Sequence, residues 1–251
     1  FGEDMSLLNS FTSKLNVVII GASGGLGKAF IKVLEQEINV ATIYAFSRND
    51  VNSASNKTSY SYIDLENEES IERASILASS SAKIDLVIVA TGILHSKQIS
   101  PEKSFAHLDP SVMMKVFNIN TIGPAIIAKY FLPKFRRDTK TVFAVLSARV
   151  GSINDNYLGG WASYRASKAA LNMLIKTSAI EQKRIASKCI LTSLHPGTVD
   201  TELSRPYQKN IKKGALSSAS NAASKLISVI NNLNYDDTGS FLAWDGNQIE
   251  Y

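Results

Sequence analysis

Tyr164 and Lys168 lie four positions apart in the stretch 161–171 (WASYRASKAAL), and together they could move a proton. A free tyrosine has a pKa near ~10, and a nearby lysine ammonium favours the phenolate and lowers that pKa. The surrounding alanines and leucine favour a helix, on which residues four apart share a face. The pair is therefore a candidate proton-transfer site. The same spacing is more often found on an inert, solvated helix surface, so its meaning depends on the rest of the chain.

A glycine-rich turn follows the first apolar run of the chain, residues 16–20. Small residues in such a turn let backbone amides and the start of the next helix approach a pyrophosphate. A tight turn without a ligand is the alternative, but this turn lies in the first strand–helix–strand unit, where dinucleotide sites form. We therefore predict that a dinucleotide is bound by Gly21, Ser23, Gly24, Gly25, Leu26 and Gly27.

Ser47 and Arg48 end the second expected strand, roughly twenty residues after Gly27. An acidic residue near this position would bind the ribose hydroxyls of NAD, whereas a hydroxyl and a guanidinium match the oxygens of a 2′-phosphate. The sequence therefore favours NADP(H) over NAD(H) as the cofactor. Asp64 and Leu65, after the third expected strand, fit a contact with the adenine, although Asp64 could equally cap the following helix.

Short β-branched apolar runs alternate with amphipathic helical stretches along the chain. This pattern is typical of a parallel sheet covered by helices on both faces. The sequence predicts one α/β domain over residues 1–251 with a mainly parallel sheet of seven strands. Strands are expected at residues 16–20, 40–46, 59–63, 84–90, 141–146, 188–194 and 239–244, and helices at residues 25–37, 67–79, 110–132, 161–183 and 215–231.

Two segments lie outside this regular pattern. Residues 1–14 are expected to form a leader that is free to move. Residues 201–215 follow the sixth strand, carry Pro206 and Tyr207 without a clean apolar stripe, and are a candidate lid over the substrate.

Composition excludes several classes of function. Hydrophobic residues make up 45% of the chain and charged residues 20%, as in soluble globular proteins. No apolar run approaches the roughly 20 residues needed to span a bilayer, and the N-terminus lacks signal-peptide features, so we expect a cytoplasmic protein. The net charge of +5 is spread along the chain, which favours attraction for an anionic cofactor over nucleic-acid binding. Cys189 is the only cysteine and the three histidines are scattered, so no metal is expected.

With these motifs placed, the chain resembles the short-chain dehydrogenase/reductase family in its compact single-domain form. More narrowly, it is similar to C-factor and sniffer-type carbonyl reductases. The family implies a Rossmann-type, doubly wound, NAD(P)-binding fold. Beyond the glycine turn and the Tyr/Lys pair, the matches are Ala90-Thr91-Gly92, Asn120, Ser147, the stretch 195–201 (HPGTVDT), the tracts 151–156 (GSINDN) and 159–161 (GGW), and the ending 244–246 (WDG).

The resemblance implies a role for each matching residue. Tyr164 would donate a proton to a carbonyl oxygen or accept one from an alcohol, and Lys168 would lower the pKa of Tyr164 and hold the nicotinamide ribose. Ser147 would polarise the substrate oxygen. Asn120 would kink its helix and anchor a water of a proton relay, unless its side chain only satisfies helix backbone. Cofactor contacts are implied for Tyr164, Lys168, Ala90, Thr91, Gly92, Pro196, Gly197, Val199 and Thr201.

Two serines compete for the place beside Tyr164. In many family members the serine lies three residues before the small residue that matches Gly151, and that position here is Ala148. Ser147 is one position out of register and Ser152 is the second candidate; we favour Ser147. Tyr164 also lies farther from the serine than is usual, so residues 152–160 are expected to bulge beside the active site.

These inferences predict an NADP(H)-dependent oxidoreductase that interconverts a small or medium apolar carbonyl compound and an alcohol. One alternative is a regulatory or signalling protein that binds NADP(H) without turnover, since fold does not fix function; such a protein would not need Tyr164 and Lys168. Another is an epimerase or dehydratase that recycles its nicotinamide, but enzymes of that class have a longer chain with a larger C-terminal substrate region. The apolar faces of the helices at 110–132 and 161–183 suggest a homodimer or homotetramer, or burial within one chain.

Overall fold

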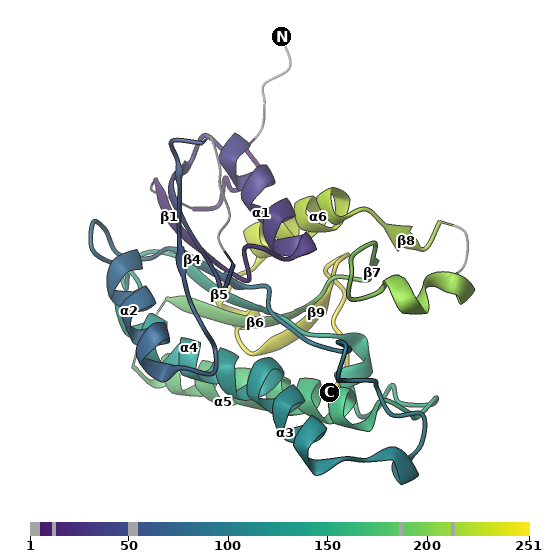
Figure 1. Ribbon diagram of the computed structural model, residues 1–251. Helices are drawn as coiled ribbons and strands as arrows, with labels where there is room; N and C mark the ends of the chain where they lie inside the picture. Colours follow the sequence, from purple (N-terminus) through teal and green to yellow (C-terminus); the bar gives the residue numbers. More distant parts are fainter. Residues whose placement is uncertain (1–5, 12–13, 50–54, 186–187, 212–213) are drawn as a thin grey trace.

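The computed structural model describes residues 6–11, 14–49, 55–185, 188–211 and 214–251. Helices and strands alternate along most of the chain (Figure 1). In chain order the elements are β1 (Leu15–Ile20), α1 (Gly25–Gln36), β2 (Val40–Ser47), β3 (Thr58–Tyr62), α2 (Glu68–Ala78), β4 (Leu86–Val89), α3 (Pro110–Phe117), α4 (Gly123–Phe131), β5 (Thr141–Leu146), α5 (Ala162–Arg184), β6 (Cys189–His195), β7 (Thr198–Val199), β8 (Leu216–Ser217), α6 (Ala219–Asn232) and β9 (Ser240–Ala243).

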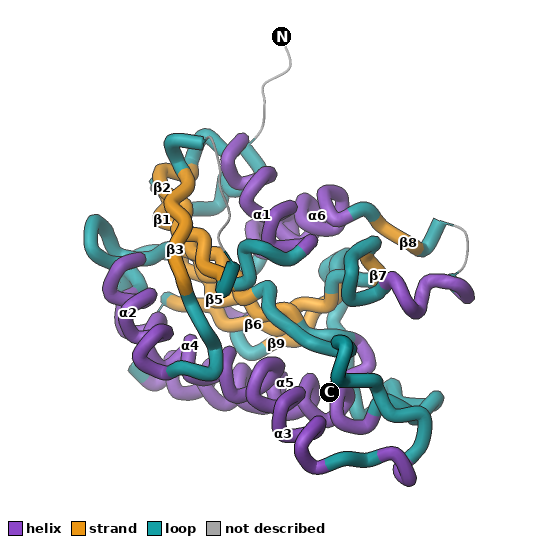
Figure 2. Tube along the Cα trace, viewed as in Figure 1, coloured by secondary structure: helices purple, strands orange, loops and turns teal. Residues whose placement is uncertain are grey.

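The order of the strands decides where a ligand crevice can form. Seven strands pair in the order β3-β2-β1-β4-β5-β6-β9, and each neighbouring pair is parallel. β1 lies between β2 and β4, so the chain passes from one half of the sheet to the other beside β1. β2 and β3 lie on one side of β1, and β5, β6 and β9 lie on the other (Figure 2). Ligands of such sheets bind outside the carboxyl ends of the strands at this crossing point. The predicted seven-stranded α/β fold is confirmed.

Helices cover both faces of the sheet, with α1 and α6 on one side and α2, α4 and α5 on the other (Figure 1). Successive side chains of a strand point to opposite faces. Val17 and Ile19 of β1 therefore join the core against α1 and α6, whereas Val18 and Ile20 join the core on the other face. Because both faces are buried, the strand is a continuous apolar run in the sequence.

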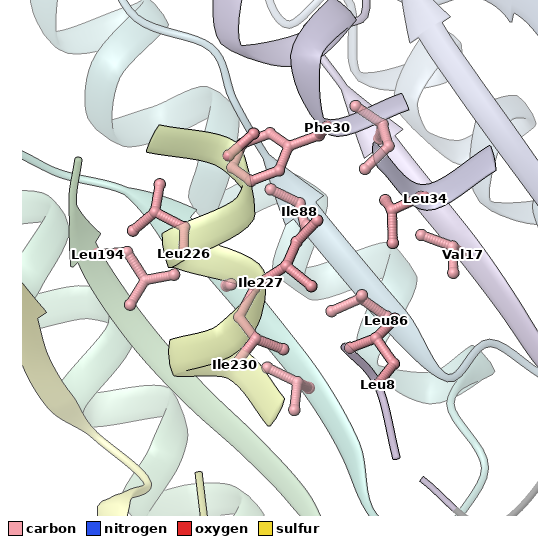
Figure 3. Close-up of a cluster of buried hydrophobic side chains, with 14 of the residues drawn as sticks. Leu8, Val17, Phe30, Leu34, Leu86, Ile88, Leu194, Leu226, Ile227 and Ile230 are labelled. Atoms are coloured by element: carbon pink, nitrogen blue, oxygen red, sulfur yellow. The ribbon is translucent and has the colours of Figure 1, made fainter. Parts of the chain in front are cut away.

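The N-terminal stretch that was expected to be a leader is packed against the domain over its described part. Leu8 is fully buried in the core between the sheet and α6, and Phe11 is 6% exposed. The backbone N–H of Ser10 donates to Oδ1 of Asn231 in α6 at 2.9 Å. Burial of two large apolar side chains holds these residues on the domain. Figure 3 shows this core, with Leu8, Val17, Phe30, Leu34, Leu86, Ile88, Leu194, Leu226, Ile227 and Ile230 labelled.

The helix expected at residues 110–132 is interrupted. It is divided into α3 and α4 by a π-helical turn, η2 (Asn118–Ile122). Pro124 has no backbone N–H, so the regular bond to the carbonyl four residues earlier is missing. The N–H of Gly123 instead donates to the carbonyl of Asn118, five residues earlier. This widened turn is the kink that the resemblance implied near Asn120.

The last helix begins later than residue 215. Leu216 and Ser217 form β8, which pairs with β7 in a separate two-stranded sheet. α6 starts at Ala219 because the side chain of Ser218 accepts a hydrogen bond from the N–H of Asn221 and caps the helix. The short sheet ties the segment after β6 to the start of α6.

Among the described residues, one helical stretch, Pro110–Lys134, is long and apolar enough by length and composition to cross a membrane. Core helices of folded proteins meet the same criterion. In this stretch Ile127 and Phe131 are buried in the core against the sheet. The stretch therefore gives no argument for a membrane protein.

Candidate active site

A cavity of about 530 Å³ lies at the carboxyl ends of the central strands. Tyr164 and Lys168 line it from α5, and Ser147 lines it from the end of β5. Tyr164 is 7% exposed and Lys168 is 3% exposed. The two side chains share the face of α5 that lies against the sheet, as their spacing predicted. The structure therefore brings the predicted proton-transfer pair and the favoured serine to one cavity.

Burial, and not the neighbouring lysine, dominates the electrostatics of Tyr164. Removal from water raises the pKa of Tyr164 to about 12, so the prediction that Lys168 lowers this pKa is wrong for the protein alone. Nζ of Lys168 lies 6.0 Å from the centre of the Tyr164 ring and donates to the carbonyl of Leu146 at 2.8 Å. Burial also lowers the pKa of Lys168 to about 8. The phenol consequently stays protonated near neutral pH.

Asn120 lies inside the π-helical turn and is fully buried. Its Oδ1 accepts from the N–H of Ile93 at 2.8 Å, and its Nδ2 donates to the carbonyl of Ile93 at 2.9 Å and to Oγ of Ser167 at 3.1 Å. The side chain therefore satisfies backbone of the loop after β4 rather than that of its own helix. Gly92 lies beside both Asn120 Oδ1 and Lys168 Nζ, since a Cβ at Gly92 would be 3.6 Å and 3.5 Å from them. The implied role of Asn120 in a proton relay stays a prediction.

The two candidate serines face different cavities. Ser147 follows β5, and its N–H donates to the carbonyl of Leu194 in β6 at 2.8 Å. Its Oγ is buried and has no hydrogen-bond partner among the described residues. Ser152 lines a separate hollow, where its Oγ accepts from the N–H of Asp155 at 3.1 Å. The placement favours Ser147, and the catalytic role of either serine stays a prediction.

His195 fixes the turn that follows Ser147. Burial and the nearby Arg149 lower the pKa of His195 to about 4, so its imidazole is neutral at physiological pH. Nδ1 of His195 accepts from the N–H of Arg149 at 3.3 Å. This contact ties the end of β6 to the 3₁₀ turn η4 (Arg149–Gly151).

A second cavity of about 280 Å³ collects the residues predicted for the adenosine end of the cofactor. Its lining includes Ser47, Arg48, Asp64 and Leu65. Asp64 does not cap α2, because that cap is Asn67, whose side chain accepts from the N–H of Ser70 at 3.1 Å. Asp64 is therefore left at the cavity wall. The two cavities share Ser23, Gly24, Ala90, Thr91 and Gly92.

The glycine-rich turn suits a dinucleotide, because glycines without side chains let its backbone segments pack closely together. A Cβ on Gly27 would lie 2.1 Å from the carbonyl oxygen of Gly21, so a side chain there would force the turn open. Gly27 does not line either cavity and acts by keeping the turn tight. Gly21 lines the adenosine-side cavity, and Gly25 and Leu26 line the larger one. Oγ1 of Thr91, at the wall of both cavities, is buried without a partner among the described residues, as a group that binds a ligand would be.

The remaining predicted contacts follow β6. Pro196, Gly197, Val199 and Thr201 all line the larger cavity. The candidate lid begins here and contains a 3₁₀ turn, η5 (Arg205–Asn210), while residues 212 and 213 of the predicted lid lie outside the described residues.

Sequence reasoning missed part of the substrate side of the cavity. Leu94, Arg149 and Trp161 line it but were not assigned there, whereas Leu203, Tyr207 and Ile211 belong to the predicted lid. The Trp161 ring lies 4.8 Å from the Tyr207 ring and 6.4 Å from the Tyr164 ring, centre to centre. A glycine pair before an aromatic residue, as at Gly159 and Gly160, is the signal that could have indicated Trp161. Among the described residues, no group of three His, Cys, Asp or Glu side chains could hold a metal.

The same ordered motifs can be compared with families of known proteins. A model of the short chain dehydrogenase family matches residues 15–212. The chain belongs to the short-chain dehydrogenase family. It is therefore an oxidoreductase, and the resemblance drawn from the sequence is confirmed.

Curated relatives of this family member include a 1-hydroxy-2-glutathionyl-2-methyl-3-butene dehydrogenase from Rhodococcus sp. (strain AD45). It is 27% identical over 237 residues, which cover 94% of this chain and 99% of that protein. A benzil reductase ((S)-benzoin forming) from Bacillus subtilis is 29% identical over 78% of this chain and 79% of its own. C-signal of Myxococcus xanthus is 30% identical over 57% of this chain and 81% of its own.

Solved structures share the fold over nearly the whole chain. NADPH-bound carbonyl reductase from chicken fatty liver superposes with a TM-score of 0.79 at 22% identity, covering 96% of both chains. Carbonyl reductase Sniffer of Drosophila melanogaster gives a TM-score of 0.80 at 20% identity, covering 96% of this chain and 100% of that one.

Replacement of each candidate serine should separate their roles. Ser147→Ala is expected to lower kcat by about 100-fold, because a hydrogen bond to the reacting oxygen is lost. Ser152→Ala should keep kcat within about threefold, because its hydroxyl faces another hollow. Steady-state kinetics give kcat for the two variants, and circular dichroism checks that both are folded. The opposite ranking would assign the role to Ser152.

Burial of Lys168 should also appear in the pH dependence of stability. The folded-state pKa of about 8 lies below the ordinary value of 10.5, so between these values the unfolded chain binds a proton that the folded chain lacks. The free energy of unfolding should therefore rise between pH 8 and pH 10, by on the order of 2 kcal/mol from this group. Urea titrations of the wild type and Lys168→Met at several pH values measure the difference. If the free energy of unfolding changed equally with pH in the two proteins, the predicted contribution of Lys168 would be contradicted.

Proposed function

We propose that this protein is an NADP(H)-dependent carbonyl reductase that runs reversibly as an alcohol dehydrogenase. The proposal rests on one observation above all. A buried tyrosine that stays protonated at neutral pH lines the same cavity as an unpartnered serine hydroxyl and the glycine-rich turn. A relative, benzil reductase, and a structural neighbour, NADPH-bound carbonyl reductase, support the same class of reaction.

The residues at the junction of the two cavities would hold the cofactor. Backbone of the glycine-rich turn and the start of α1 suit the pyrophosphate, while Ser47 and Arg48 suit a 2′-phosphate. Lys168 and Thr91, which both line the larger cavity, would hold the nicotinamide ribose. When bound, the nicotinamide supplies or accepts the hydride.

The protein's own groups would manage the substrate oxygen and its proton. The Ser147 hydroxyl would donate to the carbonyl oxygen and hold it near Tyr164. Tyr164 would then give that oxygen its phenolic proton, and its raised pKa keeps the proton available over the physiological range. Solvent exclusion by the surrounding walls strengthens both interactions.

The walls of the larger cavity favour an apolar substrate. Trp161 and Tyr207 form an aromatic edge near Tyr164, and Leu94, Leu203 and Ile211 add aliphatic surface. A small or medium carbonyl compound with an apolar group next to the carbonyl matches these walls.

Turnover of a panel of aldehydes and ketones, followed by NADPH oxidation, tests the proposal. The wild type should reduce apolar members of the panel. Tyr164→Phe should lower kcat by about 100-fold or more while it still binds NADPH, because only the proton donor is lost. Tight NADPH binding by the wild type without turnover of any member would favour the regulatory, non-catalytic alternative.

Replacement of Arg48 tests the choice of cofactor. Arg48→Asp should weaken NADPH binding by about 10- to 100-fold, because a charged hydrogen bond to the 2′-phosphate is exchanged for repulsion. NADH affinity should change by no more than about threefold. Arg184→Asp, at the far end of α5, is the matched control for the change of charge. Equal losses of NADPH and NADH affinity at Arg48→Asp would contradict NADP(H) preference.

A further inference from the structure

The helix that carries Tyr164 starts without a cap of its own. The residue at the N-cap of α5 is Trp161, whose indole ring can donate a hydrogen bond but cannot accept one. The first turn of α5 contains no acidic residue. The first backbone N–H groups of a helix have no partner inside it, so this buried start needs an acceptor from elsewhere.

Glu102, from the loop between β4 and α3, supplies that acceptor. Its Oε2 accepts from the N–H of Ser163 at 3.2 Å, its Oε1 accepts from the hydroxyl of Ser163, and its backbone carbonyl accepts from the N–H of Trp161 at 2.6 Å. Glu102 is only 4% exposed. Among the described residues, no basic side chain forms an ion pair with it. A carboxylate at a helix N-terminus is stabilised by the backbone dipoles instead.

The backbone before α5 needs this support, because it is left-handed at three successive residues. The φ angles are +64° at Gly159, +68° at Gly160 and +51° at Trp161. Glycine adopts this conformation readily, whereas tryptophan is strained in it. Arg165 of α5 holds the same segment from the other side, since its guanidinium donates to the carbonyls of Gly159 and Gly160 at 3.0 Å and 2.9 Å. Strained conformations of this kind persist only where surrounding contacts over-determine them.

The strained residue is also the one that reaches the substrate cavity. Trp161 lines the cavity and places its ring against both Tyr207 and Tyr164. A serine or aspartate is the usual N-cap residue, but at position 161 it would remove this aromatic wall. The cap is therefore supplied by a residue 61 positions before Ser163.

We propose that Glu102 is a positioning residue for catalysis: by capping α5 from a distant loop, it fixes the Trp161 wall and the hydroxyl of Tyr164 relative to the substrate. This inference rests on the proposed reductase function. Loss of the cap lets the first turn of α5 relax, and Tyr164 is the third residue of that helix. Small displacements of a proton donor slow the chemical step strongly.

Kinetics of Glu102→Ala and Glu102→Gln test the proposal, with Asn234→Ala as a control that removes a cap from the short helix before β9. Glu102→Ala should lower kcat by about 10- to 100-fold. Its NADPH dissociation constant should stay within about twofold, because the glycine-rich turn is untouched. Glu102→Gln should recover most of kcat, since its amide oxygen still accepts from Ser163. The control should keep kcat within about twofold.

The solvent deuterium isotope effect on kcat separates positioning from simple loss of folded protein. If Tyr164 is displaced, proton donation becomes more rate-limiting and the isotope effect of Glu102→Ala should rise. A fall in kcat that matches the fraction of folded protein, with an unchanged isotope effect, would overturn the proposal. A kcat of Glu102→Ala within twofold of the wild type would overturn it as well.

A readout independent of turnover keeps this test distinct from that of the proposed function. In a Trp244→Phe background Trp161 is the sole tryptophan, since the chain contains two. Adding Glu102→Ala should shift the Trp161 emission, and adding Glu102→Gln should largely restore it. An unchanged emission in the Glu102→Ala protein would reject the positioning role, whereas absence of turnover in the wild type would reject only the reductase function.

Discussion

The parallel pairing of β1 with β2 on one side and β4 on the other is the constraint on which the rest of the structure depends. Connections from β1 and β4 leave toward different halves of the sheet, so their carboxyl ends border a crevice. Gly21 follows β1 and Ala90 follows β4, and both line the crevice. Ser47 ends β2, and Ser147 follows β5. Residues that are far apart in the sequence therefore meet at one edge of the sheet.

Burial gives this edge its chemical character. Tyr164 and Lys168 are buried at this edge, and His195 at the end of β6 is partly buried and largely desolvated. In each case the neutral form becomes favoured, which raises the pKa of the phenol and lowers the pKa of the lysine and the histidine. A neutral phenol can donate a proton but is a poor base. A positive charge brought close to Tyr164 would lower its pKa again.

A few polar contacts between distant segments fix the geometry within this frame. Asn120 in the π-helical turn holds the loop after β4 through Ile93. Glu102 in the following loop holds the start of α5 through Ser163. Parallel strands and helices determine the approximate positions of the backbone. Hydrogen bonds of this kind then fix the positions of the side chains. Asn120 thereby holds Ile93, which lines the adenosine-side cavity, and Glu102 holds Ser163 between Trp161 and Tyr164, which line the larger one. Small errors in position at these walls matter most for chemistry.

The fold class, the glycine-rich turn, the Tyr164/Lys168 pair and the family could all be predicted from the sequence, because these depend on local periodicity and short spacings. It also indicated most of the residues that line the two cavities, since residues after strands of a parallel sheet meet at one edge. It did not determine the late start of α6, the packing of Leu8 or the cap from Glu102. Nor could it give the direction of the Tyr164 pKa. These depend on how much water each group loses and on partners tens of residues away, and only the tertiary structure decides both.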